Sequence, residues 1–204
     1  MIITSQKRIC MNGLFILASL SPRRNEMLTG LGLEFTVEAS GVEENHLNGE
    51  TPAEHALRLA RTKAMVVAAR HPGAWVLAAD TIVVVDGTIL GKPTDPENAR
   101  AMLRRLSGRE HRVITAFFIV GEGGARQITR AVESSVFFRD LDDDEIDWYV
   151  ASDEPYDKAG GYAIQGKAAS FVAEIRGSGT NVIGLPLAEV VQAMKRLNIV
   201  RFSG

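Results

Sequence analysis

The sequence predicts an α/β protein whose mixed β-sheet is flanked by helices. Apolar, strand-like runs alternate along the chain with segments whose apolar residues have helical spacing. Hairpin signals such as Asp86-Gly87 lie among them, which a purely parallel βαβ array would not contain. The chain has 204 residues, of which 46% are hydrophobic, so it can form one large core or two smaller ones, and wholesale disorder is excluded.

Start and stop signals define the elements of the N-terminal part. Ser21 and Pro22 are typical of a helix start, because serine caps free N–H groups and proline lacks one, and Gly32 can close that helix. Thr51 and Glu54 form a capping box that opens a longer helix. The expected elements are, in order, a strand at 14–18, a helix at 22–31, a strand at 34–39 and a helix at 52–70. Residues 1–13 are expected to be an N-terminal tail or extension, and residues 14–204 a single domain.

The C-terminal part is expected to mix hairpins with short helices. Residues 75–85 form an apolar run that turns at Asp86-Gly87, and Gly108 ends the helix that follows. The expected elements are strands at 75–85 and 88–90, a helix from about 94–96 to Gly108, strands at 112–120 and 131–138, a helix at 142–151, a loop at 153–161, strands at 162–165 and 170–175, and a helix at 187–197. The acidic residues between 140 and 147 are interpreted as a solvated helix start.

Charge and cysteine content exclude several classes of protein. The formal net charge is −2, from 23 basic and 25 acidic residues, which argues against a general nucleic-acid binder. Apolar runs stay short of the ~18 residues that a membrane helix needs. Cys10 is the only cysteine, so no intrachain disulfide forms, and a reducing, cytoplasmic location is expected. The four histidines lie far apart in the sequence and do not have the spacing of a structural zinc site.

The most informative segment is the turn from the first strand into the first helix. Its backbone N–H groups and positive dipole end favour an anion. Arg23 and Arg24 add two guanidinium groups, whose planar forks fit phosphate oxygens. The segment is therefore interpreted as a polyphosphate cradle, with a capped helix carrying two solvated arginines as the alternative.

Asp80 is a second candidate, because it stands inside the apolar strand expected at residues 75–85. An unpaired buried carboxylate is unfavourable, so this side chain is expected to have a cation, a metal ion or a shifted pKa. In a cleft it could bind Mg²⁺ or accept a proton from water. The alternative is a carboxylate that caps a turn or pairs with a surface arginine.

Three loops carry further candidates, each with a plain alternative as an exposed loop residue. Lys92 lies between Gly91 and Pro93 on a stiff backbone and suits a phosphate contact. Either Glu43 or Glu44 could supply a second metal ligand. Gln165 follows a glycine-rich stretch, and its amide carries both the donor and the acceptor needed to bind a nucleobase edge.

Taken together, these segments resemble the Maf family of nucleoside triphosphate pyrophosphatases. They occur in family order and span roughly residues 14–197. The matching segments are Leu17-Ala18-Ser19-x-Ser21-Pro22-Arg23-Arg24, Leu59-Ala60-x-x-Lys63-Ala64, Ala79-Asp80-Thr81, Gly91-Lys92-Pro93, Asp157-Lys158-Ala159-Gly160-x-Tyr162-x-Ile164-Gln165-Gly166 and Gly184-Leu185-Pro186. Residues 1–11 fall outside the resemblance, which leaves Met1 and Met11 as alternative starts.

The resemblance implies a two-lobed α/β fold around a central cleft, related to inosine triphosphatase, and a homodimer. It implies a hydrolase that uses a divalent cation, Mg²⁺ or Mn²⁺, to split a nucleoside triphosphate into monophosphate and pyrophosphate. Asp80 would be the catalytic proton acceptor, and Asp80 and Glu44 would bind the metal. The substrate-binding residues implied are Ser19, Ser21, Arg23, Arg24, Lys63 and Lys92.

The same resemblance favours the dTTP and UTP branch of the family, in which the enzyme removes excess or non-canonical pyrimidine nucleotides. Arg23, Thr81 and Gln165 occupy the positions that discriminate it from a branch acting on 7-methyl-GTP. Two alternatives remain: the same chemistry on 7-methyl-GTP or another modified nucleotide, and a non-catalytic nucleotide sensor that regulates cell division. No nucleic-acid or membrane partner is expected.

Overall fold

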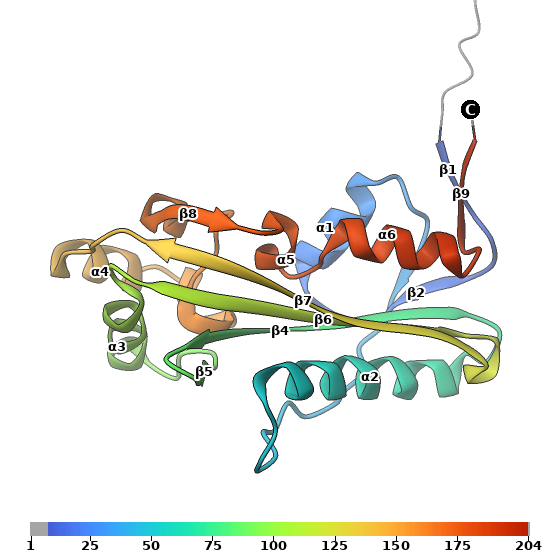
Figure 1. Cartoon of the computed structure of the whole chain (residues 1–204), viewed down its shortest axis with the longest axis horizontal. Coiled ribbons are helices and arrows are strands. Elements are labelled where there is room, and N and C mark those ends of the chain that lie inside the picture. The colour runs from blue at the N-terminus through green and yellow to red at the C-terminus, as the bar shows by residue number, and fades with distance from the viewer. Residues whose placement is uncertain (1–7, 204) are drawn as a thin grey trace, which may run out of the picture.

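The computed structural model describes residues 8–203 and arranges them as a long twisted sheet with helices on both faces (Figure 1). The strands are β1 (Arg8–Met11), β2 (Phe15–Leu17), β3 (Thr36–Val37), β4 (Trp75–Val85), β5 (Thr88–Leu90), β6 (Glu110–Gly121), β7 (Arg126–Phe138), β8 (Val172–Arg176) and β9 (Val200–Ser203). The helices are α1 (Pro22–Gly30), α2 (Pro52–Arg70), α3 (Pro96–Leu106), α4 (Asp143–Val150), α5 (Gly179–Ile183) and α6 (Leu187–Arg196). None of the helices in residues 8–203 is long and apolar enough to cross a membrane.

The main sheet is mixed, as the sequence predicts. Its order is β3-β2-β4-β6-β7-β8, and β5 also pairs with β4. β2 runs parallel to both β3 and β4, whereas the remaining ladders are antiparallel. Helix α2 covers one face, and α1, α5 and α6 cover the other (Figure 1).

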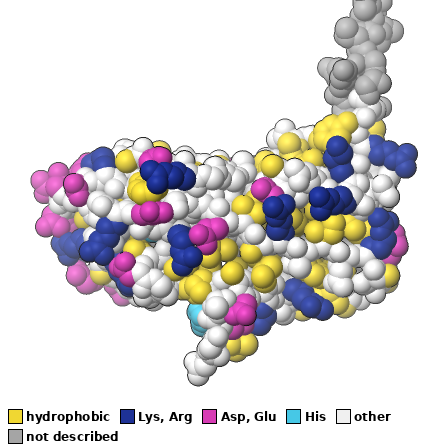
Figure 2. Space-filling model, in the orientation of Figure 1, with side chains coloured by type: hydrophobic (Ala, Val, Ile, Leu, Met, Phe, Trp, Pro, Cys, Tyr) yellow, Lys and Arg dark blue, Asp and Glu magenta, His cyan; other side chains and the backbone are white. Residues whose placement is uncertain are grey.

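The buried core divides into three clusters. The first two lie on opposite faces of the sheet and form one lobe, and the third forms the other, the α3–α4 lobe. One cluster packs the sheet against α1 and α6, around Leu28, Leu77 and Met194. A second packs the opposite face against the alanine-rich stripe of α2. The third lies at the far end of the sheet, where α3 and α4 pack on β6 and β7 around Leu103 and Tyr149. Figure 2 shows acidic and basic side chains interspersed over the visible face, consistent with the balanced charge.

The major predicted elements are confirmed. β4 has the predicted bounds, and α2 opens with the predicted box: Thr51 Oγ1 accepts from the Glu54 N–H at 3.3 Å, and the Glu54 carboxylate accepts from the Thr51 N–H at 2.8 Å. The predicted strand at 34–39 is real only at Thr36–Val37, and the strand predicted at 170–175 begins at Val172 after a 3₁₀ turn.

The strand predicted at residues 162–165 is wrong. Residues 162–163 pair with no described strand, and residues 164–165 form a turn that is closed by the Gly166 N–H donating to the Ala163 carbonyl at 3.1 Å. The Glu154 carboxylate then accepts the backbone N–H groups of Lys167 and Ala168, at 3.0 and 3.4 Å, at the start of a 3₁₀ helix. Gly166 permits this approach, since a Cβ there would lie 2.3 Å from the Glu154 Oε1.

Three elements were not anticipated from the sequence. Residues 8–11 of the predicted tail form β1, which pairs antiparallel with β9 as a separate two-stranded sheet. Residues 1–7 lie outside the described part of the chain. The short helix α5 begins after its N-cap residue, Ser178, whose side chain accepts from the Asn181 N–H.

His111 is a buried titratable group at the centre of the α3–α4 lobe. Its Nε2 lies 2.7 Å from the Tyr162 hydroxyl, and its ring meets the Phe138 and Tyr162 rings edge-on. The side chain is 1% exposed, and burial lowers its pKa from 6.5 to about 4. Because burial disfavours the imidazolium, the folded state binds a proton here only near or below pH 4.

This burial predicts an acid-sensitive component of stability. As the pH falls from about 6.5 to 4, the unfolded chain protonates at His111 before the folded chain does, so the free energy of unfolding decreases by about 3 kcal/mol from this residue. Urea unfolding of the native chain and of a His111→Gln variant, at several pH values in this window, measures the component. The component is the difference between the two proteins in how far their free energy of unfolding falls across this pH window, and an equal fall in both would contradict it.

Candidate functional site

The site begins with a gap in the edge of the sheet. β2 pairs with β4 at residues 75–77, and β5 pairs with the same edge of β4 at residues 83–85. Residues 78–82 of β4 therefore have no strand partner at this edge. The gap lies at the carboxyl end of the parallel strand β2, where the chain turns into the N-terminus of α1, a position that suits anionic ligands in α/β folds.

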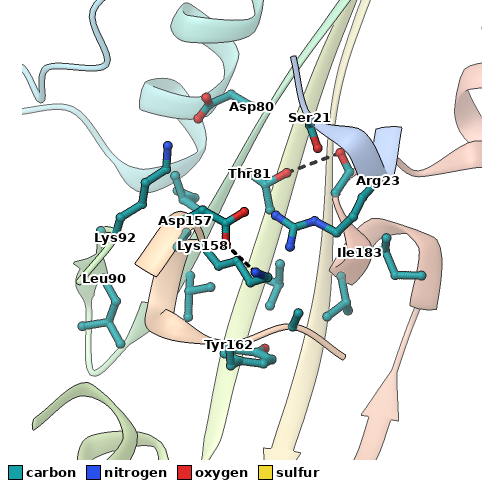
Figure 3. A pocket seen from close by; sticks show the side chains of 18 of the residues that line it. Ser21, Arg23, Asp80, Thr81, Leu90, Lys92, Asp157, Lys158, Tyr162 and Ile183 are labelled. Atoms are coloured by element: carbon teal, nitrogen blue, oxygen red, sulfur yellow. Dashed lines mark hydrogen bonds and ion pairs between the residues drawn. The ribbon is translucent and has the colours of Figure 1, made fainter. Parts of the chain in front are cut away.

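A cavity of about 460 Å³ occupies this gap, a size that suits a small ligand. Side chains from both lobes line it, and Figure 3 shows how several of them converge. Successive residues of a strand point to opposite faces, so Asp80 points toward α2 and Thr81 toward α1 and α5. Both still line the cavity, because it spans the open edge of β4.

Three charged side chains form the centre of the site. The Lys63 ammonium, on the buried face of α2, donates to Asp80 Oδ1 at 2.6 Å and to Glu44 Oε1 at 2.7 Å. Lys63 and Asp80 are 7% and 5% exposed, whereas the Glu44 side chain is half exposed. The buried Asp80 carboxylate is thus paired with a cation, Lys63, as the sequence predicts. It lies within β4 and does not cap a turn.

The pKa of Glu44 lies below its ordinary value. Burial alone would raise this pKa, but the hydrogen bond and charge of Lys63, together with the charges of Lys92 and Arg24, outweigh that effect. Glu44 is therefore ionised at neutral pH. Glu43 is exposed, accepts from Asn45 and does not line the cavity. Of the two adjacent glutamates that the sequence left as alternatives, Glu44 is therefore the one at the cavity.

The carboxylates of Glu44 and Asp80 fit a hard divalent cation. Both reach one ammonium from opposite elements, so their oxygens already converge on one point at the cavity wall. Mg²⁺ is commonly held by one or two carboxylates, with waters and substrate phosphates completing its coordination. The donor set therefore suits Mg²⁺ or Mn²⁺ together with a phosphate ligand.

Arg23 is the clearest anion-binding group. Its Nε is buried in the cavity wall and has no hydrogen-bond partner among residues 8–203, and a buried donor in that state is unfavourable. Arg23 lies in the first turn of α1, after Ser21, whose side chain forms no capping hydrogen bond. An anion in the cavity would satisfy the orphan donor and meet the positive end of the helix.

Arg24, in contrast, is held by protein acceptors. Its guanidinium donates to the Gly184 carbonyl at 2.8 Å, to Ser19 Oγ at 3.0 Å and to Thr81 Oγ1 at 3.0 Å. Burial lowers the pKa of Arg24, while the charges of Asp80 and Glu44 act in the opposite direction. Three of its five N–H donors serve the protein, so Arg24 ties β2, β4 and the segment before α6 together.

A buried polar network supports Thr81 from behind. Thr81 Oγ1 lies 2.9 Å from Thr115 Oγ1, and Thr115 donates to the Asn181 carbonyl at 2.9 Å. The Asn181 side chain donates to the Val113 carbonyl and to Ser134, each at 3.0 Å. Asn181 and Thr115 are fully buried, so the network fixes the side of the cavity opposite α2.

The structure places almost all predicted site residues at the cavity. Those lining it are Ser21, Arg23, Arg24, Glu44, Lys63, Asp80, Thr81, Lys92 and Gln165. Ser19 lies behind them, where its hydroxyl accepts from Arg24 and from the Ser21 N–H. Lys92 and Gln165 are exposed and have no side-chain hydrogen bond within residues 8–203.

Four other cavity residues with charged or imidazole side chains were not predicted to have a role. Lys158 pairs with Asp157 and donates to the Glu154 carbonyl at 2.7 Å, and both side chains face the cavity (Figure 3). Asp157 and Lys158 begin the glycine-rich segment that contains Gln165, so their adjacent opposite charges were a sequence signal for further site residues. His46 and His55 also line the cavity, and their nine-residue separation gave no comparable signal.

Known protein sequences match nearly the whole chain. Residues 14–197 match the family described as Maf-like protein. A dTTP/UTP pyrophosphatase from Syntrophus aciditrophicus (strain SB) is 54% identical over 189 residues, covering 93% of this chain and 92% of that protein. One from Myxococcus xanthus (strain DK1622) is 51% identical over 186 residues, covering 91% and 93%. Among solved structures, a HAM1 protein from Coxiella burnetii aligns with 91% of this chain and 96% of its own, at 15% identity and a TM-score of 0.45.

The geometry predicts that Glu44, but not its neighbour, contributes to cation binding. We expect Glu44→Gln to weaken Mn²⁺ binding by at least about tenfold, because it removes one of the two converging carboxylates. Glu43→Gln is the matched control and should leave Mn²⁺ affinity unchanged. Titration of free Mn²⁺ by electron paramagnetic resonance measures both, and equal affinities for the two variants would contradict the assignment.

Proposed function

The chain belongs to the Maf family, and on this premise we propose that it is a nucleoside triphosphate pyrophosphatase that hydrolyses dTTP and UTP to the monophosphate and pyrophosphate. One observation carries the proposal: a single cavity gathers the cations Arg23, Lys63 and Lys92 together with the carboxylates Glu44 and Asp80. The relatives named dTTP/UTP pyrophosphatase, half identical over nine-tenths of the chain, support the substrate class.

The triphosphate binds between the N-terminus of α1 and the loop after β5. Arg23 offers an unsatisfied buried donor, and Lys92 offers an ammonium from the opposite side of the cavity (Figure 3). Ser21, which precedes α1 and forms no capping bond, adds a hydroxyl on the Arg23 side of the cavity (Figure 3). Arg24 and Ser19 act mainly by holding this wall in place, since their polar atoms already contact the protein.

The base is recognised at the other end of the cavity. Gln165 lies on the turn that the Gly166 N–H closes, and its amide has no protein partner within residues 8–203, so it can pair with a pyrimidine edge. Thr81 contributes indirectly, because its hydroxyl contacts Arg24 and Thr115. Arg23, Thr81 and Gln165 are the specificity positions that the family resemblance implies.

Glu44 and Asp80 would hold the divalent cation. When bound, it would neutralise phosphate charge as that charge shifts to the leaving pyrophosphate. Lys63 contacts both carboxylates and so brings their oxygens to the same side of the cavity. The third N–H donor of the Lys63 ammonium can contact a phosphate oxygen, because the two carboxylates use only two of its three donors.

Asp80 accepts the proton of the attacking water. It is buried on β4, and Lys63 fixes the orientation of its carboxylate. Hydrolysis forms a new phosphorus–oxygen bond from water and breaks the anhydride between the α- and β-phosphates, so one proton must leave the water. A rigid, oriented carboxylate at the cavity wall suits this step.

The family resemblance also implies a cytoplasmic homodimer that binds no nucleic acid or membrane. The location, the dimer and the absence of nucleic-acid or membrane binding stay predictions, because they do not depend on the geometry of the cavity.

Pyrophosphate release from a nucleotide panel, with Mg²⁺ or Mn²⁺ present, tests the proposed function. We expect turnover with dTTP and UTP, and a loss of about 10²-fold or more in kcat for Asp80→Asn, the typical effect of removing a general base. Asp86→Asn, an exposed aspartate in the turn after the same strand, is the matched control and should keep native turnover.

Three results would contradict this proposal. Full turnover by Asp80→Asn would remove the catalytic role of this residue. Preference for 7-methyl-GTP over dTTP and UTP would move the chain to the other substrate class. Tight dTTP binding without any product after long incubation would make it a nucleotide sensor.

A further inference from the structure

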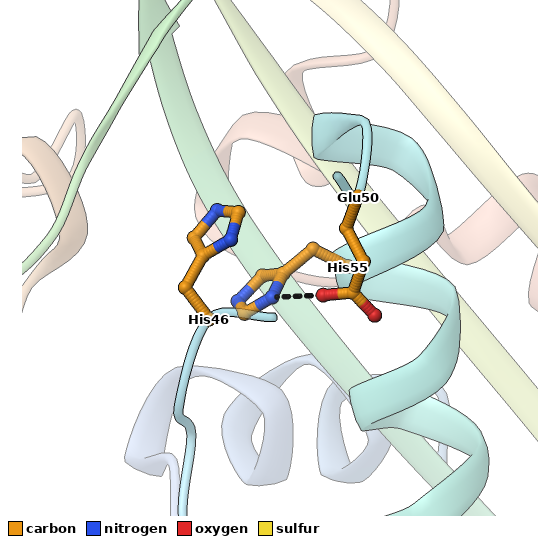
Figure 4. Close-up of side chains that lie close together, drawn as sticks. All are labelled: His46, Glu50 and His55. Carbon is orange, nitrogen blue, oxygen red and sulfur yellow. Dashed lines mark hydrogen bonds and ion pairs between the residues drawn. The ribbon is translucent and has the colours of Figure 1, made fainter. Parts of the chain in front are cut away.

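A second group of ligating side chains lies beside the nucleotide cavity. His46, on the loop before α2, Glu50, just ahead of that helix, and His55, in its first turn, bring one ligand atom each to within 4.8 Å of one another (Figure 4). The two imidazole rings are stacked, with centroids 4.2 Å apart and an interplanar angle of 11°. We propose that these three residues bind a divalent transition-metal ion, with Zn²⁺ as the representative species.

The donor set selects a different class of metal from that of the Glu44–Asp80 pair. Two imidazole nitrogens and one carboxylate oxygen suit Zn²⁺, Co²⁺, Ni²⁺ or Cu²⁺, whereas two carboxylates suit Mg²⁺ or Mn²⁺. Three protein ligands leave a fourth tetrahedral position open. His46 and His55 line the cavity, so this position would be accessible from the nucleotide side.

Two of the three ligands are already held in place. His55 is 5% exposed on α2, and its Nδ1 lies 3.2 Å from Glu50 Oε2. Glu50 also accepts the Leu47 N–H at 3.3 Å. His46 is exposed on its loop and is the ligand free to adjust. Ligand atoms of a tetrahedral zinc site lie about 3.3 Å apart, so closing the cluster needs a movement of about 1.5 Å. The His46 ring must also rotate out of its stack on His55, because a metal ion lies in the plane of each imidazole that binds it.

Arg58 is the group that a metal ion must displace. Its guanidinium contacts both Glu50 oxygens, and its Nη2 lies 3.2 Å from His55 Nδ1. A cation in the cluster would therefore compete with this guanidinium for the same lone pairs. The Arg58 side chain is 31% exposed and can turn toward solvent. Arg58 thus sets the metal affinity of the site, and removing it should raise that affinity.

Zinc binding to the full chain tests the proposal. Isothermal titration with Zn²⁺, in excess Mg²⁺ to saturate the hard-cation site, should show one zinc ion per chain. We expect His46→Ala to weaken binding at least tenfold and Arg58→Ala to tighten it several-fold. His71→Ala is the matched control, because His71 also pairs with a carboxylate, Glu38 at 2.6 Å, but lies outside the cluster.

A spectroscopic measurement on the native chain tests the same ligands without relying on a variant that could fold differently. Cu²⁺ added to the native chain should give an electron paramagnetic resonance spectrum with hyperfine splitting from two imidazole nitrogens, reduced to one in His46→Ala. Absence of zinc binding, equal zinc affinity in His46→Ala and His71→Ala, weaker binding in Arg58→Ala, or a copper spectrum without nitrogen splitting would each overturn the proposal.

Discussion

The ammonium of Lys63, shared by two carboxylates, is the interaction on which the site depends. Asp80 could not remain buried in an apolar strand without a cation, and Lys63 could not remain buried on α2 without an anion. The hydrogen bond of 2.6 Å between them locks α2 to β4 at one register, and the second bond, to Glu44, brings an exposed loop to the same point. The ion pairs that neutralise Lys63 therefore also place two carboxylates, those of Asp80 and Glu44, together at the cavity wall.

The sheet supplies the space that this pair needs. The partners of β4 change from β2 to β5 along one edge, and the five residues between them are left open. The open edge lets neighbouring residues of a single strand, Asp80 and Thr81, serve one cavity from opposite faces. Arg24 and the Thr115–Asn181 network stiffen the second face, so that each wall has its own polar support.

Sequence reasoning predicted the long elements because their signals are local. Local patterns also nominated Arg23, Arg24 and Asp80 as site candidates, whereas Ser19, Lys63 and Thr81 were nominated only by the family resemblance. Each of these patterns can be recognised from a few neighbouring residues: a capping box, an isolated aspartate in an apolar strand, and a serine-proline-arginine-arginine turn. It could not choose between Glu43 and Glu44, since adjacent exposed glutamates differ only in which one reaches Lys63. It also could not separate the roles of Arg23 and Arg24, which depend on acceptors as distant as Gly184.

The remaining failures have the same physical origin. β1 is paired by a strand nearly 190 residues later, and the strand expected at 162–165 is replaced by a turn ahead of the 3₁₀ helix that begins at the Glu154 carboxylate. The His46–His55 stack depends on how a loop folds back onto α2, which no periodicity encodes. Contacts between residues distant in the sequence decide these features, and local patterns carry no information about them.

A double-mutant cycle on Lys63 and Asp80 tests the central claim most directly. Urea unfolding should show that Lys63→Met lowers the free energy of unfolding by about 3–5 kcal/mol, because it leaves a buried carboxylate unpaired. Adding Asp80→Asn to that variant should restore part of the loss, since no charge is then stranded. Strictly additive effects of the two substitutions would show that the ion pair does not hold the site together, and would contradict the account.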